Sequence, residues 1–190
     1  MKRKKLNRWL AGGLVFLLVW FFPLSGFCQK ASIKDVKVKG TNSVWKVSFE
    51  VENCITNKME EGIQSGIRTT FTFYIRLYQK RSWWRDRKVA SVEVRHTVLY
   101  HPIQKVYQVK LGEKHPPLAV SSLEEVKRLM SKVKELEIRS SSPLEPRVPA
   151  YFQIKAELDP VRLPLHLEHL FFFVSLWDFE TSWHLEPLMP

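Results

Sequence analysis

The stretch IRTTFTFYIRLYQK, residues 67–80, decides the fold class of this chain. Its odd positions from Phe71 to Leu77 are all apolar, whereas its even positions carry arginine, threonine, tyrosine or lysine. Side chains of a β-strand alternate between two faces, so a period of two predicts a long strand with one buried face. The residues expected in the core are Phe71, Phe73, Ile75 and Leu77.

A second alternating run follows the interruption at residues 81–86. In this run, residues 90–100, five apolar residues occupy even positions: Ala90, Val92, Val94, Val98 and Tyr100. The two runs predict a long antiparallel hairpin, and the change of parity requires the numbers of facing residues to have an odd sum. A turn centred on residues 83 and 84 sets this sum at 167. Ile75 should therefore face Val92.

The same alternation, bounded by turn residues, predicts further strands and a loop. The expected strands are residues 33–39, 44–51, 103–111 and 148–158, and the expected loop is residues 140–149. The last part of the chain is apolar and ambiguous, because residues 163–174 fit a short helix and residues 177–185 fit a terminal strand.

Two helices are expected beside these strands. Asn57 is placed to cap a short helix over residues 58–65. Ser122 and Glu125 have the spacing of a capping box, and apolar residues continue at helical spacing as far as Leu136. The sequence therefore predicts an α+β, β-rich fold: an antiparallel sheet or sandwich of long hairpins, with one or two amphipathic helices packed against it.

The N-terminus has the order of a secretory signal. Basic residues within positions 2–8 precede an apolar run over residues 9–22, and Pro23 follows. This run is shorter than the roughly 20 residues that span a bilayer. We therefore expect residues 1–28 to be a cleaved signal peptide, with an uncleaved N-terminal anchor as the alternative. Residues 29–190 should form a single β-rich domain.

Charge and cysteines limit the classes of partner. Without the five basic residues of the signal, 25 basic residues face 19 acidic ones, a net charge of +6. This excess favours a membrane surface or an acidic envelope protein, while a solvated basic surface is the alternative. Export argues against nucleic acid. An exported compartment permits a disulfide between Cys28 and Cys54 if cleavage falls before Cys28. If cleavage falls after Cys28, Cys54 is a small buried residue.

Candidate catalytic groups are sparse. His166 and His169 resemble half of a metal site, but no third ligand has matching spacing. Asp178 and Glu180 are a carboxylate pair, for which a strand-end salt bridge with the basic surface is the preferred explanation over acid–base chemistry. We therefore expect no metal, no cofactor and no enzymatic activity. A hydrolase that uses these four residues is the alternative function.

The most unusual local feature is the expected tip of the central hairpin. It contains Trp83, Trp84, Arg85 and Arg87. Aromatic and basic side chains together suit a membrane interface or a partner groove. A turn that folds back, with tryptophan stacked on arginine above the core, is the alternative. Because one sheet face cannot accept both indoles, we expect at least one to be exposed and these four residues to form a binding surface.

Several segments carry a family resemblance: GIRTTFTF at 66–73, WWRDR at 83–87 with Val89-Ala90, the turn at 100–107, and the tail from Leu163-Pro164 through Trp177 to Trp183. Together they resemble the bacterial family catalogued as domain of unknown function 4390, over about residues 33–183. The resemblance implies a small exported protein of Gram-negative-type bacteria, in the periplasm or anchored at the periplasmic face of the inner membrane. Members are often encoded near a membrane sensor kinase, which implies a link to signalling. The resemblance implies no catalytic residues.

Overall fold

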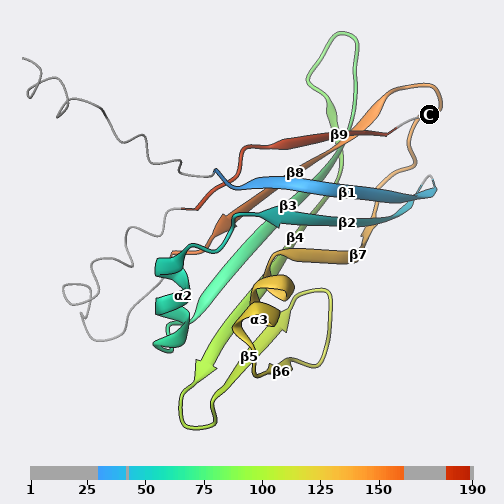
Figure 1. Ribbon diagram of the computed structural model, residues 1–190. Helices are drawn as coiled ribbons and strands as arrows, with labels where there is room; N and C mark the ends of the chain where they lie inside the picture. Colours follow the sequence, from blue (N-terminus) through green and yellow to red (C-terminus); the bar gives the residue numbers. More distant parts are fainter. Residues whose placement is uncertain (1–29, 42, 161–178, 189–190) are drawn as a thin grey trace, which may run out of the picture.

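The computed structural model describes residues 30–41, 43–160 and 179–188, which form two antiparallel sheets (Figure 1). The smaller sheet has the order β1-β2-β7, with β1 at Ser32–Thr41, β2 at Val44–Glu52 and β7 at Lys132–Arg139. The larger sheet has the order β6-β5-β4-β3-β8-β9, and its strands are β6 Leu118–Val120, β5 Val106–Leu111, β4 Arg87–His101, β3 Thr69–Gln79, β8 Ala150–Leu158 and β9 His184–Leu188. The predicted α+β, β-rich class is confirmed.

The central hairpin has the predicted register. In the β3–β4 pair, Ile75 faces Val92, and the sum of 167 holds as far as the Leu77–Ala90 pair. A bulge after Leu77 then shifts the pairing by one residue towards the turn. The four predicted core side chains of β3 are at most 1% exposed. Alternation and parity therefore predicted this hairpin correctly.

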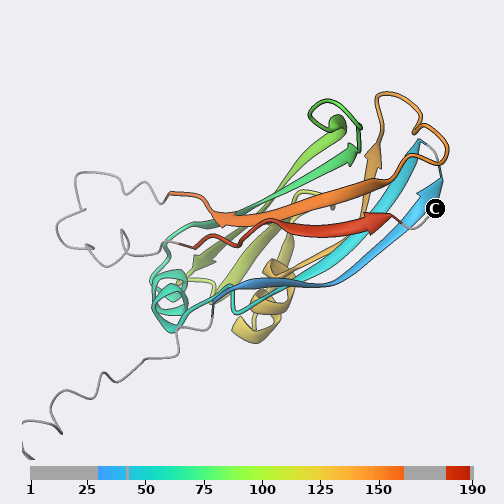
Figure 2. The ribbon, with the colours of Figure 1, turned by 90° about the horizontal axis from the view of Figure 1, so that it is seen from above.

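The core lies between the two sheets. Phe49 of β2 meets Phe73 of β3 edge to face, with ring centroids 5.7 Å apart, and Trp45 meets Phe152 of β8 at 6.1 Å. Figure 2 shows β1 and β2, in blue, running along the orange and red strands β8 and β9 of the other sheet. The inward positions of both sheets thus bury their apolar side chains against each other, which is the main stabilising contribution in a sandwich.

Helix α2, Asn57–Gln64, is the predicted short helix, but its cap is one residue earlier than predicted. Thr56 has the extended backbone of an N-cap, and its Oγ1 accepts a hydrogen bond from the Met59 N–H at 3.3 Å. Asn57 is the first residue inside the helix. The helix ends before Gly66, whose positive φ of 83° favours glycine. Across the described residues, helices are too short and too polar to span a bilayer.

The helix predicted as far as Leu136 is wrong in its second half. Helix α3 covers only Leu123–Met130, the Ser122 side chain makes no capping hydrogen bond, and the chain continues as β7. Val133 faces Phe49 and Leu136 faces Val47, and the register between these two pairs is shifted. Glu135, at φ 49°, lies in this bulge. Because of the bulge, Val133 and Leu136 lie on the same face of the strand although they are three residues apart. A spacing of three is also typical of one face of a helix.

Two strand limits also differ from the prediction. Strand β5 begins at Val106, because residues 102–105 form the turn after β4, and Ile103 is 97% exposed there. Strand β9 is a short edge strand that begins well after residue 177. Residues 161–178, which include most of the ambiguous tail, lie outside the described residues. The predicted hairpin over 33–51, the loop at 140–149 and the strand ending at Leu158 are confirmed.

Candidate functional site

The tip loop, residues 80–86, connects β3 to β4 and projects beyond the sheets (Figure 1). Trp83 is 95% exposed and Trp84 is 76% exposed. The prediction that at least one indole is exposed is confirmed, and neither ring covers the core. Two adjacent exposed tryptophans keep a large apolar area in contact with water, which favours a contact with another surface.

The base of the tip loop is fixed to the sheet through Asp86. Its carboxylate accepts hydrogen bonds from the backbone N–H of Arg81 at 3.3 Å and from the hydroxyl of Tyr151 on β8 at 2.7 Å. Partial burial, together with this hydrogen bond, raises the pKa of Tyr151 to about 12. The tyrosine therefore stays protonated near neutral pH and keeps donating to the carboxylate.

Arg87 has a different role from its neighbour Arg85. Its Nη2 donates to Gln79 Oε1 at 2.7 Å and lies 3.6 Å from Glu145 Oε1. It also donates to the carbonyl of Pro143 at 3.5 Å. Arg87 thus ties the loop at 140–149 to the base of the tip loop, whereas Arg85 is exposed. Of the four predicted binding residues, three lie in the exposed part of the loop.

The tip loop and the start of β4 are strongly basic. Residues 80–88 contain five basic residues and one acidic residue, Asp86. Within the described part of the chain, the Arg81 and Arg85 side chains take part in no ion pair, in contrast to Arg87. The exposed indoles therefore lie in a positive field, because the basic residues outnumber the single carboxylate and the outer guanidinium groups are not neutralised.

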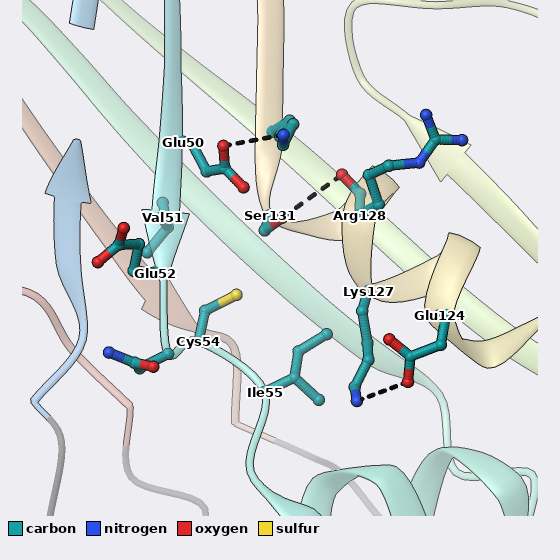
Figure 3. Close-up of a pocket in the computed structure, with 11 residues that line it drawn as sticks. Glu50, Val51, Glu52, Cys54, Ile55, Glu124, Lys127, Arg128 and Ser131 are labelled. Atoms are coloured by element: carbon teal, nitrogen blue, oxygen red, sulfur yellow. Dashed lines mark hydrogen bonds and ion pairs between the residues drawn. The ribbon is translucent and has the colours of Figure 1, made fainter. Parts of the chain in front are cut away.

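A second candidate is a cleft of about 620 Å³ between the end of β2 and helix α3 (Figure 3). Its basic side chains are paired: Lys132 Nζ lies 2.9 Å from Glu50, and Lys127 Nζ lies 2.6 Å from Glu60 and 3.0 Å from Glu124. The pairs raise the pKa of Lys127, and the Glu60 hydrogen bond contributes most. Neutralised charges of this kind do not attract a charged ligand strongly.

Cys54 lines this cleft and is 6% exposed. Burial raises the pKa of its thiol to about 12, so the thiolate that a nucleophile needs is absent near neutral pH. Cys28, the other cysteine of the chain, lies outside the described residues, so the disulfide and the free Cys54 stay alternative predictions. The cleft therefore offers a structural cysteine and closed ion pairs, with no activated nucleophile among its lining residues.

The residues of the alternative hydrolase are mostly outside the described residues. His166, His169 and Asp178 lie there. Glu180 is described, and its carboxylate lies on the surface, 3.1 Å from Lys155 Nζ. This contact is the strand-end salt bridge that the sequence predicts for Glu180. In residues 30–41, 43–160 and 179–188, no three His, Cys, Asp or Glu side chains are placed to hold a metal ion.

The structure also contains a buried histidine–carboxylate hydrogen bond that the sequence patterns did not predict. His96 of β4 has a fully buried side chain, and its Nε2 lies 2.8 Å from Oε2 of Glu113, whose side chain is 6% exposed. His96 also meets the Phe73 ring edge to face at 4.8 Å. The two residues follow no sequence motif, and only the pairing of β4 with β5 brings them together. Because both side chains are buried and His96 packs against Phe73, we assign the pair a role in the stability of the fold.

Comparison with known proteins identifies a family. The family described as Domain of unknown function (DUF4390) matches residues 28–186. No curated protein and no solved structure matches this chain.

Proposed function

The chain belongs to the DUF4390 family, a domain of unknown function, and from its geometry we propose that it is a non-catalytic binding module of the cell envelope that contacts an anionic membrane surface through the tip loop. The observation that carries this proposal is the pair of exposed indoles, Trp83 and Trp84, between the exposed basic residues Arg81 and Arg85. Tryptophan is enriched where a protein meets the headgroup region of a bilayer, because its ring is apolar and its N–H is polar.

Electrostatics supports the same surface. A basic side chain near an anionic leaflet contributes about 1 kcal/mol. Lys80, Arg81, Arg85 and Lys88 are exposed in or beside the tip loop. Several such cations next to two indoles combine an apolar anchor with a basic patch, the kind of two-signal combination that strengthens membrane binding beyond what either supplies alone.

The proposal includes export. The order of the first 28 residues supports a signal peptide, and the mature domain would then act in the periplasm or at the periplasmic face of the inner membrane. In that position the tip loop would face the outer leaflet of the inner membrane. A link to a sensor kinase is consistent with such a site, because the sensing domain of a membrane kinase lies at the same surface.

Export predicts a processed N-terminus. We expect N-terminal sequencing of the chain recovered from the periplasm to begin at or after Phe27. An intact Met1 on the exported chain would mean that residues 9–22 anchor it instead, because an uncleaved apolar segment stays in the bilayer.

Replacing both tip indoles should weaken membrane binding. We expect W83S/W84S in the full chain to bind vesicles of phosphatidylcholine with about one quarter phosphatidylglycerol about tenfold more weakly than the wild type. The free energy of unfolding should change by less than about 1 kcal/mol, because both side chains are exposed. Vesicle co-sedimentation and urea denaturation measure the two effects.

The matched control is Ile103→Ser, which removes an equally exposed apolar side chain from the turn at the other end of β4. This variant should bind vesicles as the wild type does, because its turn carries no indole pair. Equal vesicle binding by W83S/W84S and the wild type would contradict the proposed function. So would unfolding of the double variant, since it would make the indoles part of the stable fold.

A further inference from the structure

A groove of about 480 Å³ lies on the outer face of the larger sheet, directly beside the tip loop. Its outer-face walls come from Tyr151 and Gln153 of β8, from Leu185 and Pro187 of the edge strand β9, and from Pro149 just before β8. Ala150 and Leu188, which pack on the core side of the same strands, complete the lining. Lys80 and Asp86 of the tip loop line its remaining side. We propose that this groove holds one acyl chain of an anionic phospholipid, whose phosphate is bound by Lys80. The identity of the ligand rests on the proposed function.

Strand pairing explains why the groove faces away from the core. Tyr151 is paired with Pro187 and Gln153 with Leu185, so these side chains share one face of the sheet. The alternate residue Phe152 is fully buried on the opposite face, against the smaller sheet. Leu185 is 57% exposed although it lies on a strand. An apolar floor on a solvent face is not required for folding, and this favours a ligand role.

The edge strand is poorly suited to binding a peptide by strand addition. Strand β9 has five residues and contains Pro187, which provides no backbone N–H. A short edge with a proline is a common protection against added strands. The groove therefore offers side-chain surface and few free backbone donors, which suits a hydrocarbon chain better than a peptide.

The charges at the groove fit an anionic lipid. The Lys80 side chain is exposed, and the nearby carboxylate of Asp86 already accepts a hydrogen bond from Tyr151 at 2.7 Å. Asp86 remains charged, but residues 80–88 carry five basic side chains against this single carboxylate, so the mouth lies in a net positive field. A positive mouth beside apolar walls matches a phosphate joined to an acyl chain. The backbone N–H of Lys80 donates to the Pro149 carbonyl at 2.9 Å, so the loop that carries the indoles also forms the edge of the groove. If the tip loop binds in the headgroup region of a membrane, the opening of the groove lies next to the phospholipids.

The test uses dioctanoyl phosphatidylglycerol below its critical micelle concentration, titrated into the full chain and followed by calorimetry. We expect saturable binding of one lipid per chain. Leu185→Glu should weaken it by about tenfold or more, because a carboxylate would face the acyl chain. Lys80→Ser should weaken the phosphatidylglycerol complex, and glycerol phosphate alone should not bind measurably. The matched control Ile103→Glu places the same charge at an exposed apolar site far from the groove and should leave binding unchanged.

The two proposals fail separately. W83S/W84S should bind vesicles about tenfold more weakly but should bind the soluble lipid as the wild type does, because its groove is intact. If W83S/W84S binds vesicles more weakly but the wild type does not bind the soluble lipid, the groove proposal alone is overturned. Equal soluble-lipid binding by Leu185→Glu and the wild type would also overturn it. A different contradiction would come from sedimentation analysis that shows the wild type as a dimer and Leu185→Glu as a monomer. That result would assign the groove to a second copy of this chain and would overturn the proposal that it holds a lipid.

Discussion

Replacing Phe73 with alanine should lower the free energy of unfolding by about 3–5 kcal/mol. Phe73 is 1% exposed on β3, the strand paired with both β4 and β8. Its ring meets Phe49 of the opposite sheet at 5.7 Å and His96 at 4.8 Å. The substitution would leave a cavity at the contact between the two sheets, which rigid strands on both sides cannot close. Urea denaturation followed by far-UV circular dichroism measures the loss.

Ile103→Ala is the control for this prediction. The Ile103 side chain is 97% exposed, so its truncation should change the free energy of unfolding by less than about 0.5 kcal/mol. A loss below about 1 kcal/mol for Phe73→Ala would contradict the packing of β2 on β3, because a ring at such a contact cannot be removed at so small a cost.

His96→Leu should destabilise the fold by about 3–5 kcal/mol, because it leaves the buried carboxylate of Glu113 without its partner. Replacing both residues with leucine should recover most of this loss, since no buried charge remains. Thermal and urea denaturation of the two single variants and the double variant form a double-mutant cycle. A loss below about 1 kcal/mol for His96→Leu would show that water reaches Glu113 in the folded state.

The same pair predicts a dependence on pH. Burial by itself raises the pKa of Glu113, but the hydrogen bond and the charge of His96 outweigh it, and the net pKa is lowered below its ordinary value. A carboxyl whose pKa is lower in the folded than in the unfolded chain stabilises the fold above its unfolded pKa. This stabilisation is lost as the pH falls through the folded pKa.

The comparison that tests this dependence is the wild type against Glu113→Gln from about pH 7 to about pH 3. The wild type should lose stability more steeply on the acid side, because the amide that replaces the carboxylate in the variant cannot take up a proton. Parallel stability curves for the two proteins would contradict the lowered pKa.

Local pattern was enough for the long hairpin. The register of β3 with β4 follows from parity, because each strand alone shows which of its positions are apolar and the turn position fixes the sum. The exposure of Trp83 or Trp84 followed from the same register, since a turn centre cannot direct both rings to one sheet face. The failure at residues 131–136 has an equally local cause. A bulge at Glu135 gives a strand the apolar spacing of a helix.

The sequence by itself thus determined the β-rich class, the central hairpin and the composition of its tip, because these depend on period and on neighbours in the chain. Only the tertiary structure decided which strands join which sheet. It alone placed His96 beside Glu113, and it alone set β9 next to β8 to form the groove under the tip loop. Both features depend on which strands pair within the larger sheet, β4 with β5 and β8 with β9. The period of a single strand shows which of its side chains are buried, but it does not record which side chain of another strand lies beside them.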